Sequence, residues 1–148
     1  MILLPDVRQS EQWDCGRAEY NRVLTHHGHA VEANQWCGTP QTGTDPLHLE
    51  IAFRIARCPI LAGHFTLESL AYMTDRESVP VVCLIQYAGD GHYVTVRGVK
   101  DGRVHFSCPS RGPRQSVTEK FWMRNWHDVG RNGARYRCWG VAVWPPEG

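Results

Sequence analysis

The sequence predicts a single α+β domain in which N-terminal helices pack on a C-terminal antiparallel sheet. Apolar residues recur at helical spacing in the first half of the chain, and the second half alternates apolar and polar residues between Gly-rich turns. A length of 148 residues with 42% hydrophobic and 21% charged residues is typical of one soluble domain and argues against disorder. We therefore expect one domain spanning residues 1–148.

The first half of the chain is expected to be helical. Asp14 is a good N-cap and would place Cys15 in the first turn of a helix that stops at Gly28. A loop rich in Gly, Thr and Pro follows over residues 37–46. Helical spacing then predicts two further helices, over residues 47–56 and 66–74.

The hydrophobic period changes in the second half to that of strands. A continuous apolar run is typical of a buried strand, and alternating segments on both sides of Lys100-Asp-Gly102 predict a hairpin. A further amphipathic segment predicts a helix laid over the sheet. The expected strands are 79–87, 92–99, 103–107 and 140–144, and the expected helix is 117–126. We expect Trp122, Trp126, Trp139 and Trp144 to pack this helix on the sheet.

Charge and cysteine usage exclude several classes of protein. A net charge of +1 argues against a nucleic-acid backbone or an anionic membrane as partner. No apolar run reaches about 18 residues, so membrane insertion is not expected. The start of the chain lacks the basic segment of a signal peptide, so we expect free thiols in the cytoplasm. Residues 111–137 carry seven basic and two acidic residues, which we interpret as a solvated face rather than an anion-binding surface.

Three residues have the types that thiol chemistry needs. Cys15 opens a helix, whose N-terminus lowers the pKa of a thiol, although the Asp14 carboxylate opposes this unless the cap engages it. His92 follows a Gly-Asp-Gly turn and would present an imidazole base at the mouth of the sheet. Gln9, six residues before Cys15, could donate its amide to a developing oxyanion. Trp13, beside Cys15, is a candidate wall of a substrate cleft.

The histidines at 26, 27 and 29 could hold a metal. They surround a predicted helix end, where the helix dipole favours imidazoles, so we expect no metal site there. The cysteines lack Cys-x-x-Cys spacing, and no cofactor is expected.

Two motifs in this order resemble those of the bacteriocin-processing cysteine peptidases. They are Gln9-Ser-Glu-Gln-Trp-Asp-Cys-Gly16 and Gly91-His-Tyr-Val-Thr-Val96. That family consists of papain-like domains that cut leader peptides after a double glycine, and the similarity covers residues 9–126. It implies Cys15 as nucleophile, His92 as general acid and base, and Gln9 as oxyanion donor together with the Cys15 backbone N–H. The resemblance implies a peptide or protein substrate, such as a leader-bearing precursor, for this domain, which we expect to stand alone.

One position departs from the family's pattern. The family places an orienting Asp just before a Pro at the end of the strand after the His strand, and this chain has Cys108 before Pro109. A neutral thiol stabilises an imidazolium poorly, so Ser107, Ser110 or a side chain from another loop would have to substitute. The alternatives to a peptidase are a catalytically weak relative that binds peptides or proteins, and a thioester-forming acyltransferase or amidase. The oligomeric state stays open.

Overall fold

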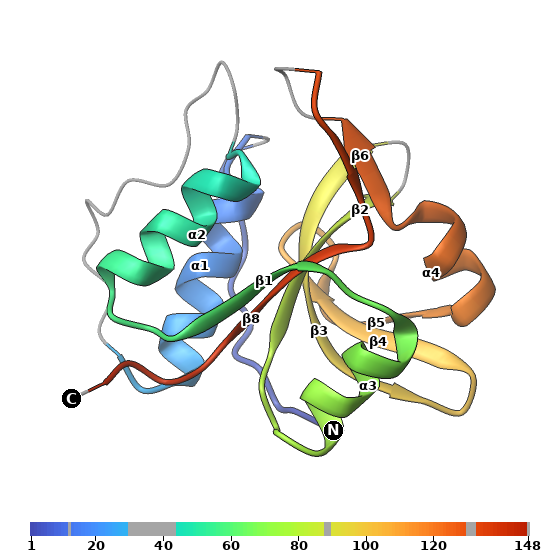
Figure 1. Cartoon of the computed structure of the whole chain (residues 1–148), viewed down its shortest axis with the longest axis horizontal. Helices are drawn as coiled ribbons and strands as arrows, with labels where there is room; N and C mark the ends of the chain where they lie inside the picture. The colour runs from blue at the N-terminus through green and yellow to red at the C-terminus, as the bar shows by residue number, and fades with distance from the viewer. Residues whose placement is uncertain (12, 30–43, 88–89, 130–132, 148) are drawn as a thin grey trace.

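A computed structural model describes residues 1–11, 13–29, 44–87, 90–129 and 133–147, which form a sheet flanked by helices (Figure 1). The helices are α1 (Cys15–His26), α2 (Pro46–Ile55), α3 (Leu67–Asp75) and α4 (Glu119–Asn125). The strands are β1 (Ile60–His64), β2 (Val81–Tyr87), β3 (Asp90–Lys100), β4 (Arg103–Cys108), β5 (Gly112–Thr118), β6 (His127–Val129), β7 (Arg135–Arg137) and β8 (Trp139–Val143). The main sheet is antiparallel with the order β1-β8-β2-β3-β4-β5, and β6 pairs with β7 in a separate ribbon. The predicted α+β class is confirmed.

Two apolar cores lie on opposite faces of the main sheet, because successive residues of β2 and β8 point to opposite sides. On one face, α1 and α2 pack through Tyr20, Leu49 and Phe53 onto strand residues such as Leu84 and Tyr93. The other face carries α3 and α4, and the core there includes Leu70, Trp122 and Trp126 together with Phe106 of β4. In Figure 1 the α1–α2 pair and the α3–α4 pair stand on either side of the strands.

The predicted helices of the first half are present, within one or two residues at their ends. Thr66 caps α3 by accepting a hydrogen bond from the Ser69 backbone N–H at 3.0 Å, and the Ser69 hydroxyl completes a capping box. Pro46 occupies the first turn of α2, and Gly28 follows α1 with a φ of 73°. Within the described residues, no helix has the length and apolarity needed to cross a membrane.

The strand predictions were right for β2, β3, β4 and β8, and four other strands were missed. The predicted helix over 117–126 was wrong at its start, because residues 117 and 118 belong to β5. That strand ends where the Thr118 hydroxyl accepts a hydrogen bond from the Phe121 backbone N–H at 3.1 Å, so α4 begins at Glu119. β3 begins at Asp90 and so includes Gly91, which was expected in a turn.

The expected packing of the tryptophans holds for the core beneath α4, which contains Trp122 and Trp126 and has Trp144 packed against it. It is wrong for Trp139. This residue lies in the core of the opposite face, edge-on to Tyr93 with ring centroids 6.1 Å apart. Its backbone still links the two faces, because its carbonyl accepts a hydrogen bond from Trp126 Nε1 at 3.0 Å.

Candidate active site

Cys15 is the first residue of α1 and lies against β3. The backbone N–H groups of Tyr93 and Gly16 hydrogen-bond its sulfur. Tyr93 directly follows His92 in β3, so the fold brings the predicted nucleophile to the strand that carries the predicted base. These two positions lie 77 residues apart in the chain, and the packing of α1 on β3 joins them.

The neighbourhood of Cys15 leaves no room for a side chain at residue 16. A Cβ atom on Gly16 would lie 2.7 Å from both Cβ and Oγ1 of Thr44. Thr44 is itself held in place, because its carbonyl accepts a hydrogen bond from the Tyr93 hydroxyl at 2.6 Å. Gly16 therefore lets the start of α1 approach the segment before α2 and the strand β3 together.

The electrostatic environment of Cys15 differs from the one expected at a helix N-terminus. The pKa of the Cys15 thiol is raised to about 11, mainly by burial and to a lesser extent by the charges of Glu19 and Asp14. The hydrogen bonds from the Tyr93 and Gly16 amides lower the pKa but do not offset the burial. Cys15 is therefore a neutral thiol at pH 7, and a base has to remove its proton when it reacts.

Asp14 occupies the N-cap position of α1 but makes no capping hydrogen bond, so its predicted role was wrong. Its buried carboxylate turns back to the preceding loop instead. It accepts hydrogen bonds from the Ser10 hydroxyl at 2.7 Å, the Ser10 backbone N–H at 3.3 Å and the Glu11 backbone N–H at 3.1 Å. These bonds satisfy the carboxylate and fix the loop that follows Gln9.

Gln9, the predicted oxyanion donor, lies between two fixed points. Its backbone N–H donates to the Pro109 carbonyl at 3.0 Å, which ties it to the end of β4. Its side-chain Nε2 donates to the Glu11 carbonyl at 2.9 Å. Its role as an oxyanion donor stays a prediction.

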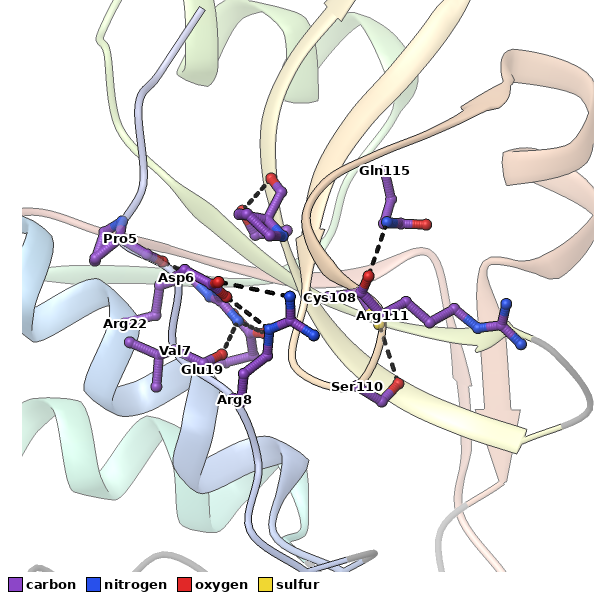
Figure 2. Close-up of polar contacts among 12 residues, drawn as sticks. Pro5, Asp6, Val7, Arg8, Glu19, Arg22, Cys108, Ser110, Arg111 and Gln115 are labelled. Carbon is purple, nitrogen blue, oxygen red and sulfur yellow. Dashed lines mark hydrogen bonds and ion pairs between the residues drawn. The ribbon is translucent and has the colours of Figure 1, made fainter.

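Cys108, at the predicted orienting position, is the last residue of β4 and is fully buried. Its Sγ lies 3.4 Å from the Ser110 hydroxyl, and it makes no hydrogen bond with Nδ1 of the His92 ring. Figure 2 shows Arg8 beside Cys108, with its Nε donating to Asp6 Oδ1 at 2.7 Å. The thiol thus sits where the resemblance implies an aspartate, without orienting the imidazole.

A carboxylate that sequence reasoning missed lies next to the strand position of His92. Asp128 of β6 accepts hydrogen bonds from Gln86 Nε2 at 2.7 Å and from the Val129 backbone N–H at 2.8 Å. The same carboxylate packs on Gly91, where a Cβ atom would overlap its Oδ2 and lie 3.0 Å from its Cγ. Gly91 and Gln86 are 37 and 42 residues away from Asp128 in the chain, so no local pattern could have indicated these contacts.

Several predicted features are less defined by the structure. Trp13 is half-buried beside Cys15, and its part in a cleft stays a prediction. His27 Nε2 lies 2.8 Å from the Val143 carbonyl, and no three His, Cys, Asp or Glu side chains of the described residues group as metal ligands. Five cysteines of the described residues are free thiols, namely Cys15, Cys58, Cys83, Cys108 and Cys138. Cys37 and most of the loop predicted over residues 37–46 lie outside the described residues. The cytoplasmic location stays a prediction.

Comparisons with known proteins bear on this geometry. The sequence matches the Peptidase C39 family over residues 4–129. The structure is similar to that of a double glycine motif protease from an AMS/PCAT transporter in complex with the leader peptide, with 19% identity and a TM-score of 0.76, covering 96% of this chain and 91% of that one. No curated protein matches the chain.

Two further similar structures are peptidase domains of the transporter ComA. The Streptococcus mutans domain in complex with a small-molecule inhibitor is 16% identical, with a TM-score of 0.67 over 95% of this chain and 99% of that one. The Streptococcus domain of the bi-functional transporter involved in quorum sensing is 17% identical, with a TM-score of 0.68 over 99% of this chain and 100% of that one. These likenesses confirm that the predicted helix-on-sheet fold is that of these protease and peptidase domains.

Proposed function

The chain belongs to the peptidase C39 family, and we propose that it is a cysteine peptidase with Cys15 as nucleophile and His92 as general base. The observation that carries the proposal is the contact between the Cys15 sulfur and the backbone N–H of Tyr93, immediately after His92. This contact places a thiol at a helix N-terminus beside the strand of an imidazole. Thiol hydrolases activate a cysteine through an imidazole within hydrogen-bond reach, and this contact supports such a pair.

The raised pKa of Cys15 determines how the first step proceeds. As Sγ attacks the carbonyl carbon of the scissile bond, His92 takes the thiol proton, and the carbonyl π electrons move to oxygen. The Gln9 amide and the backbone N–H of Cys15 donate hydrogen bonds to this oxyanion. The C–N bond then breaks, His92 protonates the leaving amine, and a thioester remains on Cys15.

Water completes the cycle through the same groups. His92 takes a proton from water as the water oxygen attacks the thioester carbon. The C–S bond breaks, the thiol regains its proton, and the acid product leaves. Since Cys108 does not hold the imidazole, we expect turnover to be slower than in an enzyme with an orienting carboxylate. Losing such a carboxylate can cost on the order of 10⁴ in rate.

The substrate we propose is a peptide with a pair of glycines before the cleavage site, as in a leader-bearing precursor. Support comes from the family membership and from the similar protease, whose structure was solved with its leader peptide. Glycine has no side chain, so a glycine pair lets a nucleophile and an oxyanion donor approach the scissile carbonyl closely.

The test is hydrolysis of a panel of synthetic peptides that contain Gly-Gly at varied positions, followed by mass spectrometry. We expect cleavage after the second glycine in the wild-type chain and loss of all cleavage in Cys15→Ser and in His92→Ala, with folding intact by circular dichroism. Cleavage that survives in Cys15→Ser would overturn the assignment of the nucleophile. Cleavage at unrelated bonds by the wild-type chain would overturn the proposed substrate.

A second candidate function is peptide binding without cleavage. It is favoured by the buried Cys108 thiol, which contacts Ser110 rather than the imidazole, and by the raised pKa of Cys15. Calorimetry with the same Gly-Gly peptides separates the two functions. Tight binding with the peptide intact after a day supports a binding protein, whereas product formation supports the peptidase.

A further inference from the structure

A fully buried ion pair lies on α1, one turn after Cys15. Glu19 and Arg22 are both 0% exposed, with Arg22 Nε 2.8 Å from Glu19 Oε2 and Nη2 3.1 Å from Oε1. Removing two charges from water costs several kcal/mol per ion, so apolar side chains at these positions would stabilise the fold as well or better. Stability alone therefore does not account for the pair.

Arg22 also binds the N-terminal strap, which we define as residues 5–9. Its Nη1 donates to the Pro5 carbonyl at 2.9 Å and its Nη2 donates to the Val7 carbonyl at 2.6 Å. Figure 2 shows Arg22 reaching these strap residues beside Glu19. The planar guanidinium holds its donors in a rigid fork, so one side chain fixes the strap and Glu19 in a single geometry.

The network extends to the strand of the proposed base. Thr95, three residues after His92 in β3, donates its hydroxyl hydrogen to Glu19 Oε2 and is itself fully buried. Glu19 therefore joins α1 to β3, and Arg22 joins α1 to the strap. These three segments carry the three residues assigned to catalysis, namely Cys15 on α1, His92 on β3 and Gln9 on the strap.

Gln9 depends on this network for its position. The Val7 carbonyl, two residues before it, is held by Arg22, and the Asp14 carboxylate holds Ser10 and Glu11 after it. We propose that Glu19, Arg22 and Thr95 are positioning residues that fix Gln9 relative to Cys15, so that oxyanion donor and nucleophile move as one unit. This inference rests on the proposed function and deepens it. A displacement of about 1 Å at such a site can cost about 10² in rate.

The chain offers a matched control for Arg22. Arg97 is another buried arginine that donates to the N-terminal segment, through Nε to the Ile2 carbonyl at 2.9 Å, seven residues before Gln9. Lysine keeps the positive charge but cannot span several acceptors at once. Arg22→Lys therefore removes the fork beside Gln9, and Arg97→Lys removes a comparable bond at the far end of the segment.

The probe is a peptide aldehyde that ends in Gly-glycinal. The Cys15 sulfur adds to the aldehyde carbon, the C=O π bond breaks, and the thiol proton passes to the oxygen, which gives a hemithioacetal whose oxygen occupies the oxyanion site. We expect Arg22→Lys to weaken its binding at least 10-fold and Arg97→Lys to change it less than 2-fold. Equal losses in the two variants, at matched unfolding midpoints, would overturn the proposal.

A milder variant keeps the proposal testable if Arg22→Lys does not fold. Thr95→Val retains shape and removes one hydrogen bond to Glu19, and we expect it to weaken aldehyde binding about 3-fold with little change in KM for a cleaved peptide. An unchanged aldehyde affinity in a folded Thr95→Val variant would contradict the network.

A substrate-free measurement separates this proposal from the proposed function. The charge of Glu19 raises the pKa of Cys15, as does that of Asp14, while Arg22 and Thr95 face Glu19 itself. Glu19→Gln should therefore shift the pH profile of Cys15 alkylation by iodoacetamide to lower pH, and Arg97→Lys should not. An unshifted profile in Glu19→Gln refutes the network. If the wild-type chain binds no aldehyde and cuts no peptide, the proposed function is refuted. The alkylation profile then still decides whether Glu19 acts on Cys15, because that measurement needs no substrate.

Discussion

Gly91 lies directly before His92, and replacing it with alanine should separate the β6–β7 ribbon from the sheet. The new Cβ atom would overlap Asp128 Oδ2 and lie 3.0 Å from Cγ and 3.3 Å from Oδ1. The carboxylate cannot retreat and keep its 2.7 Å hydrogen bond from Gln86. β6 would therefore move away from β2 and β3 at the point where the proposed base is held.

The cost can be worked from these contacts. A hydrogen bond to a charged group contributes about 1.5–3 kcal/mol, and the lower value applies because this one is only partly buried. Overpacking adds about 1–3 kcal/mol. Alanine regains about 0.5–1 kcal/mol over glycine in a strand, because less backbone entropy is lost. Gly91→Ala should thus lower the free energy of unfolding by about 1.5–4 kcal/mol.

Urea unfolding of four variants tests this reasoning. Gly98→Ala is the matched control on the same strand, because the three atoms nearest to its Cβ, with Cγ at 3.0 Å, all belong to the flexible and exposed side chain of Met1. It should change stability by less than about 1 kcal/mol. Gly91→Ala combined with Asp128→Ala should be no less stable than Asp128→Ala alone, because the overlap is gone. If Gly91→Ala is as stable as Gly98→Ala, or if the two costs simply add, the contact with Asp128 does not constrain residue 91.

Four further outcomes are expected. Because burial raises the pKa of Cys15 to about 11, its alkylation by iodoacetamide at pH 7.5 should be slower than that of an exposed thiol. The alkylation rate should rise roughly tenfold per pH unit from pH 8 to 10. A plateau of the rate near pH 8.5 would contradict the raised pKa. Asp14→Asn should speed the alkylation of Cys15, because a negative charge near the thiol is lost. The same variant should slow peptide hydrolysis about 10-fold, because Ser10 and Glu11 lose the carboxylate that holds them. A change of both rates in the same direction would contradict the role of Asp14 as a link between α1 and the preceding loop. Cys108→Asp should raise kcat at least 10-fold over Cys108→Ser, measured on the same peptide, if position 108 can orient the imidazole. Burial raises the pKa of Glu19 from 4.5 to about 7. The contribution of the Glu19 carboxyl group to the free energy of unfolding is therefore complete below pH 4.5 and is lost as the pH rises through 7. The urea midpoints at pH 5 and pH 8 should differ less in Glu19→Gln than in the wild type.

The parts of the fold that could be predicted are those whose signals are local. The N-cap and capping box at Thr66, the proline at 46 and the glycine at 28 each mark a helix end through a few neighbouring residues. β1 shows why other elements were missed. β1 pairs with β8, about 80 residues later, so the bonds that make residues 60–64 a strand leave no mark in their own sequence.

The candidate site divides in the same way. Cys15, His92 and Gln9 could be named because they stand in short motifs, but the burial that raises the Cys15 pKa depends on tertiary packing. Glu19 and Arg22 were missed although a signal existed. They share a helix face with Val23 at spacings of three and four residues, and Val23 belongs to the buried core. Charged residues inside an apolar stripe indicate a buried pair, and this pattern was available in the sequence.

The position of β8 in the sheet has a consequence for how the molecule is assembled. This strand is the last element in the chain, yet it lies between β1 and β2 rather than at an edge. During synthesis the ribosome releases Cys15 early, and the sheet under α1 and α2 stays split until residue 143 has emerged. The nascent chain therefore contains Cys15 long before the sheet that α1 packs on is complete. The order of synthesis therefore delays the completion of the sheet against which α1 and Cys15 pack.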